Sequence, residues 1–200
     1  AFCILGIPPK IRFDGKGFIL NGRPYPLRGV SRHQDRKGAG VAITREMMEE
    51  DMALILEMGA NTIRLAHYQH AQAFYDLCDE KGLASGGNPL HHDAHAQRAR
   101  QHADPDEELI AAELQPPCIA VWGCPMKLPP PAVNEELLEN HRALNDLAHK
   151  LDPTRLTTMA NVFMLEITSR ILEIPDVKAT TCILGWYLGE LDQNRMNFLM

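Results

Sequence analysis

The sequence predicts an α/β fold in which helices cover a parallel sheet. Downstream of about residue 27, short apolar strand-like segments alternate with segments whose apolar residues recur at helical spacing, which is the pattern of repeated βα units. About six strand positions can be counted in this way, fewer than the eight that close a (β/α)8 barrel of roughly 250 residues. We therefore expect a TIM (β/α)8-type barrel that is incomplete, with about six βα units.

The N-terminal part of the chain predicts a separate β segment. IRFD and GKGFIL read as short strands, and Asn21-Gly22 between apolar runs is a strong signal for a type I′ hairpin. We expect residues 1–26 to form this β-hairpin segment and residues 27–200 to form the partial barrel.

The first helix of the barrel is marked at both ends. Thr44 fits an N-cap, and Gly59 fits the position just after the last helical turn. Between them, Met48, Met52 and Ile55 form an apolar stripe at helical spacing. The stripe predicts which side of this helix packs on the sheet.

The next elements continue the alternation. A strand over Asn61 to Leu65 precedes a helix over about Ala71 to Lys81, and a strand over Cys118 to Trp122 precedes a long helix capped by Asn134. Between these units, Ser85-Gly86-Gly87-Asn88 occupies a strand position, where glycines weaken the prediction.

Charge and cysteine usage exclude several classes of partner. The net charge is −6 and the pI is near 5.8. No Lys/Arg run offers a basic surface, so neither nucleic acid nor a membrane is expected as a partner. The five cysteines are widely spaced without a C-x-x-C pair, which argues against a disulfide framework or a zinc knuckle. No signal peptide or membrane span is recognisable, so a cytoplasmic location is expected.

Several long stretches, in a fixed order, carry a resemblance to a known family. KGFILNGRPYPLRGVSRHQDR, NTIRLAHYQH, FYDLCDEKGL, HRALNDLAHKLDPTR and GWYLGEL together resemble the catalytic barrel of family 2 glycoside hydrolases, of the bacterial β-galactosidase/β-glucuronidase kind. The resemblance implies a carbohydrate substrate, specifically a β-glycoside, and no required cofactor.

The resemblance also implies two catalytic glutamates, which retaining enzymes hold about 5 Å apart. The family acid/base lies in a W-G-x-x-N-E segment, which here reads Trp122-Gly123-Cys124-Pro125-Met126-Lys127. Lys127 thus stands at the acid/base position and Met126 at the position of the Asn. The family nucleophile lies in an E-Y-G type segment, and none follows GWYLGEL here. Activity is expected to be weak or altered.

Other mouth residues of the family do have counterparts. The resemblance implies that His33 and His67 lie near the sugar and its departing charge, together with Lys127 as the catalytic set. It implies a substrate-binding set as well. That set is Arg64, Asp35, Trp122 and Trp186. Alternatively, Arg64 and His33 belong to a buried polar network that supports the barrel.

Three further functions fit the sequence. His91, His92 and His95 crowd into one segment and could hold a divalent metal, as in a metal-dependent hydrolase or oxygenase, although a solvated polar loop has the same composition. Lys127 beside apolar residues could form a Schiff base, or it could be an exposed lysine before three prolines. An incomplete sheet also has open edges, which favours a non-catalytic module that self-associates as a homo-oligomer.

Overall fold

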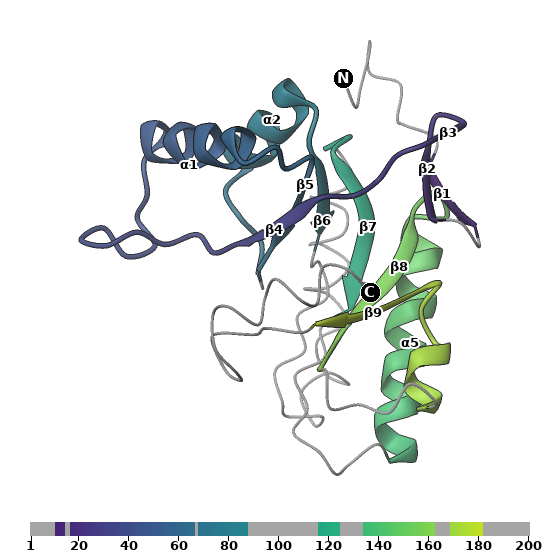
Figure 1. The fold of residues 1–200 in the computed structure, drawn as a ribbon. Coiled ribbons are helices and arrows are strands. Elements are labelled where there is room, and N and C mark those ends of the chain that lie inside the picture. Colours follow the sequence, from purple (N-terminus) through teal and green to yellow (C-terminus); the bar gives the residue numbers. More distant parts are fainter. Residues whose placement is uncertain are drawn as a thin grey trace, which may run out of the picture.

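The structure is a computed structural model, shown in Figure 1. It describes residues 11–14, 17–66, 68–87, 116–124, 134–162 and 169–181. The strands are β1 (Ile11–Asp14), β2 (Gly17–Leu20), β3 (Arg23–Pro24), β4 (Gly29–Arg32), β5 (Thr62–Leu65), β6 (Ala84–Gly87), β7 (Ile119–Cys124), β8 (Leu156–Val162) and β9 (Val177–Thr181). The helices are α1 (Arg45–Glu57), α2 (Gln72–Lys81), α5 (Glu135–Leu151) and the 3-10 helix η1 (Arg170–Glu173).

Six strands form one parallel sheet in the order β4-β5-β6-β7-β8-β9. Their order in space equals their order along the chain, which is what successive βα units produce. β4 and β9 lie at opposite edges, and the described strands do not close on each other. The prediction of an α/β fold with an incomplete barrel of about six strands is confirmed.

The strands present two different faces. Ile63 and Leu65 of β5 are fully buried in one large cluster with Met52 of α1 and Phe74 of α2. Residues of α5 and β7 belong to the same cluster, so the three α-helices cover one side of the sheet (Figure 1). We call this side the helix face. Successive side chains alternate in direction, so Arg64 lies on the opposite, inner face.

The helix ends follow the local sequence signals. The Oγ1 atom of Thr44 accepts a hydrogen bond from the Met47 backbone N–H at 3.4 Å, and α1 begins directly after this cap. Gly59 follows the end of α1 with a φ of 77°, and Gly82 ends α2 with a φ of 72°. Glycine adopts this left-handed conformation without the steric cost that a Cβ atom adds.

β6 is a full member of the sheet although its sequence is rich in glycine. It pairs with β5 on one side and with β7 on the other, and its register with β7 shifts between Ser85 and Gly86. The Ser85 backbone N–H donates to the Cys118 carbonyl at 2.7 Å. Strand pairing uses backbone N–H and C=O groups, so β6 can be held by hydrogen bonds to both neighbouring strands although its glycines have no side chains to pack.

The N-terminal hairpin has the predicted turn. Leu20 of β2 pairs with Arg23 of β3 across a two-residue loop. In that loop Asn21 has a φ of 51° and Gly22 a φ of 81°, as a type I′ turn requires at both central positions.

The hairpin packs on the inner face of the sheet. Phe18 of β2 forms a second apolar cluster with Ala84 of β6 and Ala120 of β7. Both alanines lie near the N-terminal ends of their strands, so the hairpin covers the end of the sheet opposite to the strand C-termini. The boundary between residues 26 and 27 stays a prediction.

The long helix α5 is joined to the sheet through Trp122 of β7. The Trp122 side chain is fully buried, and its Nε1–H donates to Asp152 Oδ2 at 3.0 Å, just after α5 ends. Arg155 Nη1 donates to the same oxygen at 2.7 Å. Burial by itself would raise the pKa of Asp152, but hydrogen bonds from Thr154, Arg155 and Trp122 together hold that pKa below its usual value. No helix of the described residues is both long and apolar enough to cross a membrane.

An Asp152→Ala change should lower the free energy of unfolding by about 3 kcal/mol, because it leaves the buried Trp122 N–H and the Arg155 guanidinium without their shared acceptor. Urea denaturation followed by circular dichroism measures this. Glu49→Ala, which removes an exposed ion pair with Arg45, is the matched control and should change stability very little. Equal effects of the two changes would contradict the structural role of Asp152.

Candidate functional site

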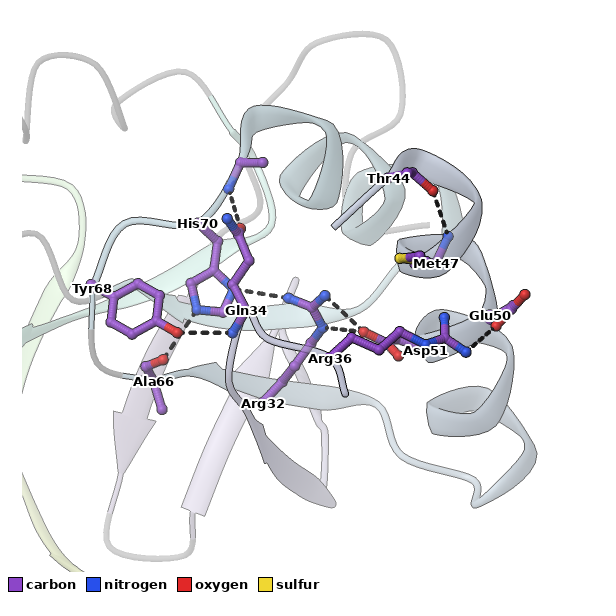
Figure 2. A network of polar contacts seen from close by, with 11 residues as sticks. Arg32, Gln34, Arg36, Thr44, Met47, Glu50, Asp51, Ala66, Tyr68 and His70 are labelled. Carbon is purple, nitrogen blue, oxygen red and sulfur yellow. Dashed lines mark hydrogen bonds and ion pairs between the residues drawn. The ribbon is translucent and has the colours of Figure 1, made fainter. Parts of the chain in front are cut away.

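The candidate site lies at the C-terminal ends of the parallel strands, where barrel proteins bind their ligands. Two loops are described there: residues 33–44 between β4 and α1, and residues 66 and 68–71 between β5 and α2. We call this region the barrel mouth. Figure 2 shows the polar contacts within it.

Arg32, the last residue of β4, is a buried cation at the base of the mouth. It pairs in register with Leu65, so it points to the helix face, and it is only 6% exposed. Its Nε and Nη2 atoms donate to Asp51 Oδ2 of α1 at 3.0 and 2.8 Å. Its guanidinium carbon lies 3.8 Å from the centre of the Phe74 ring. A carboxylate and an aromatic ring thus compensate the burial of this charge.

His70 is the second buried polar residue, held between the two loops. Arg32 Nη1 lies 3.1 Å from His70 Nδ1, and His70 Nε2 lies 3.2 Å from the Ala66 carbonyl oxygen. A guanidinium can only donate and a carbonyl can only accept, so the proton of the neutral ring is assigned to Nε2. Burial, and then the nearby Arg32 and His33, lower the pKa of His70 to about 4 against the opposing hydrogen bond to Ala66. His70 is therefore neutral at physiological pH.

Tyr68 and Gln34 also connect the β4–α1 loop with the β5–α2 loop. The Gln34 backbone N–H donates to the Tyr68 hydroxyl at 3.0 Å, and Gln34 Oε1 accepts from the Ala71 backbone N–H at 2.6 Å (Figure 2). The Tyr68 ring stacks on the His70 ring with centroids 5.2 Å apart. These contacts join both loops into one unit at the mouth.

Three of the predicted site residues lie at the mouth or on the inner face. His33 is exposed, and its ring centroid lies 6.2 Å from that of Tyr68. Asp35 is exposed in the same loop as His33. Arg64 is half-buried on the inner face, and burial lowers the pKa of its guanidinium from the usual value.

Two expectations need correction. Trp122 was expected to contact the substrate, but its side chain is fully buried on the helix face and bonded to Asp152, so it packs in the core. The alternative that His33 belongs to a buried polar network is also wrong, because His33 is exposed. The buried polar residue is its neighbour Arg32, because side chains of successive residues in a strand point in opposite directions.

The remaining predicted residues lie outside the described part of the chain. These are Lys127, His67, Trp186, His91, His92 and His95. Within the described ranges, no three His, Cys, Asp or Glu side chains gather as a metal ion would require. The metal site predicted in the histidine-rich segment stays a prediction, because that segment falls in the gap between residues 87 and 116.

Sequence reasoning missed the network that organises the mouth. One signal was available for Arg32, because it follows Val30 at the strand period of two and therefore shares the face of an apolar residue. No comparable signal exists for His70, whose contact with Arg32 joins residues 38 positions apart. Asp51 and Tyr68 likewise gain their roles only from their tertiary neighbours.

Comparison with known proteins agrees with this geometry. Residues 11–85 match the family model described as glycosyl hydrolases family 2, TIM barrel domain. The chain belongs to the family 2 glycosyl hydrolases. A β-glucuronidase of Bacteroides fragilis is 40% identical over 73% of this family 2 chain and 22% of the relative. A β-galactosidase of Thermoanaerobacter pseudethanolicus is 33% identical over 74% of the chain and 20% of the relative.

The similarity extends to solved structures of family 2 enzymes. A crystal structure of an FMN-binding β-glucuronidase from Faecalibacterium prausnitzii has a TM-score of 0.81 at 38% sequence identity, over 95% of this chain and 30% of that one. The family 2 chain spans about a fifth of the length of the two curated relatives, 22% and 20%.

Acidification should destabilise this family 2 barrel through His70. The pKa of His70 is about 4 in the fold against 6.5 as its usual value. The unfolded chain therefore binds the proton more readily, and stability falls as the pH drops from 6.5 towards 4, by about 3 kcal/mol in all.

Urea denaturation of the chain and of its His70→Gln variant between pH 7 and pH 4 measures this effect, and NMR titration of the His70 ring measures its pKa directly. The variant should lack this part of the acid dependence. An identical acid dependence in both proteins, or a ring that titrates near pH 6.5, would show that His70 is not buried as a neutral ring.

Proposed function

We propose that this chain binds β-glycosides at the barrel mouth and hydrolyses them weakly or not at all. The proposal of weak or absent hydrolysis rests on two residues. In the sequence resemblance, Lys127 and Met126 occupy the positions where the family has the acid/base Glu and its preceding Asn. The family membership and the mouth geometry support the proposal of glycoside binding.

The described mouth offers groups suited to a sugar. Arg64 lies on the inner face, and His33 and Asp35 lie in the loop that follows β4. Together they supply a cation, an imidazole and a carboxylate, which are polar groups of the kind that fix a small ligand in a pocket. His67 and Trp186 complete the proposed set from the sequence resemblance.

The substrate class follows from what the relatives share. The Bacteroides fragilis relative is a β-glucuronidase and the Thermoanaerobacter pseudethanolicus relative is a β-galactosidase. Both names describe β-linked pyranosides, which differ in the ring substituents. The proposal is therefore a β-glycoside, with glucuronides and galactosides as the two probes.

The substitution at position 127 determines the expected chemistry. A carboxylic acid that protonates the departing oxygen contributes typically 10²–10⁴-fold to the rate. A lysine ammonium does not replace it, because its ordinary pKa lies far above that of a carboxyl group. Binding of the sugar by the other mouth residues does not need this proton transfer.

Calorimetric titration with phenyl β-glucuronide and phenyl β-galactoside should show binding of at least one of them, both to the chain and to its Lys127→Glu variant. Hydrolysis of the same glycosides by the unchanged chain should stay near the rate in buffer. Heat changes no larger than those of dilution in both proteins would refute sugar binding. Turnover at about 1 s⁻¹ or more, the lower end of ordinary enzymes, would refute the loss of activity.

A further inference from the structure

Tyr68 stands where the two described loops of the mouth meet. Its ring stacks on His70 at 5.2 Å and lies 6.2 Å from the ring of His33, tilted by 53°. Its hydroxyl accepts the Gln34 backbone N–H at 3.0 Å. The buried His70 ring and the Gln34 backbone amide (Figure 2), together with the exposed His33 ring, thus fix both the plane and the hydroxyl end of Tyr68.

The His70 ring, on which Tyr68 stacks, is held in place by hydrogen bonds. His70 is 3% exposed and is hydrogen-bonded through both ring nitrogens, to Arg32 and to the Ala66 carbonyl. Because each partner fixes one nitrogen, the imidazole can neither flip nor change tautomer without leaving a buried polar group unsatisfied. The ring on which Tyr68 stacks therefore keeps its orientation.

The hydrogen-bonding capacity of Tyr68 is only partly used. A phenol hydroxyl has one donor and can also accept, and the bond from Gln34 uses an acceptor position. Among the residues that the structure describes, none accepts a hydrogen bond from the Tyr68 hydroxyl, and the Tyr68 side chain is only half-buried. The phenolic proton is thus available to donate to a ligand oxygen.

We propose that Tyr68 is a sugar-binding residue that donates its phenolic proton to an oxygen of the bound β-glycoside. This inference rests on the proposed function. Pyranosides present hydroxyl or carboxylate oxygens as acceptors, and apolar C–H faces that pack on aromatic rings. A tyrosine with one polar end and an apolar ring meets both needs. The exposed ring of His33 lies beside Tyr68. Because the family resemblance implies that His33 lies near the sugar, Tyr68 belongs to the same proposed site.

Tyr68→Phe removes the hydroxyl and keeps the ring. We expect about tenfold weaker binding of phenyl β-glucuronide or phenyl β-galactoside in calorimetry, as one lost hydrogen bond produces. A loss confined to the glucuronide assigns a carboxylate as the acceptor, and a loss with both glycosides assigns a hydroxyl that they share. Tyr25→Phe removes the same hydroxyl from the N-terminal hairpin, which packs on the sheet away from the mouth, and should leave both affinities unchanged.

A second measurement avoids any variant. In the unchanged chain with isotope-labelled tyrosine, the ring signal of Tyr68 should shift as glycoside is added, while that of Tyr25 should not. If the unchanged chain binds a glycoside but Tyr68→Phe binds it equally well and the Tyr68 signal stays fixed, the assignment of Tyr68 is wrong. If the unchanged chain binds neither glycoside, the proposed function fails and this inference fails with it.

Discussion

Side chains along the parallel strands alternate between two faces, and this period of two decides the roles of Arg32, Arg64 and Trp122. The register of β4 with β5 places Arg32 beside Leu65, on the side that packs against helices. The same alternation turns Arg64 to the inner face. On β7 it turns Trp122 into the core, where the resemblance to known enzymes had implied a place at the substrate. A shift by one residue would exchange all of these positions.

The buried guanidinium of Arg32 carries a desolvation penalty, and the contacts that offset this penalty hold the mouth together. A buried charge is tolerated only when it is paired and hydrogen-bonded. Asp51 supplies the counter-charge, neutral His70 supplies an acceptor, and Phe74 covers the guanidinium. Because these partners come from α1, from the β5–α2 loop and from α2, satisfying one cation joins three separate elements. The half-buried Tyr68 ring stacks on His70 and so lies on this base.

Scaffold and chemistry are separable in this protein. Helix caps, apolar stripes and the strand ladder keep the family fold, and none of them involves Lys127, which the sequence resemblance puts at the acid/base position. These features act through local backbone geometry and burial, and they do not depend on which side chain stands at a strand C-terminus. The loss of catalytic carboxylates that we propose is therefore compatible with the observed sheet and helices, and so is the proposed binding of a glycoside at the mouth.

The sequence by itself determined the fold class, the two helices between Thr44 and Gly82, and the hairpin turn at Asn21-Gly22, because caps, stripes and turns are set by residues close together in the chain. It predicted His33, Asp35 and Arg64 as site residues through resemblance alone. Only the tertiary structure decided that Arg32 and His70 form the buried pair and that Trp122 lies in the core. Those roles depend on contacts between residues far apart in sequence, such as the 38 positions between Arg32 and His70, and no local pattern encodes such contacts.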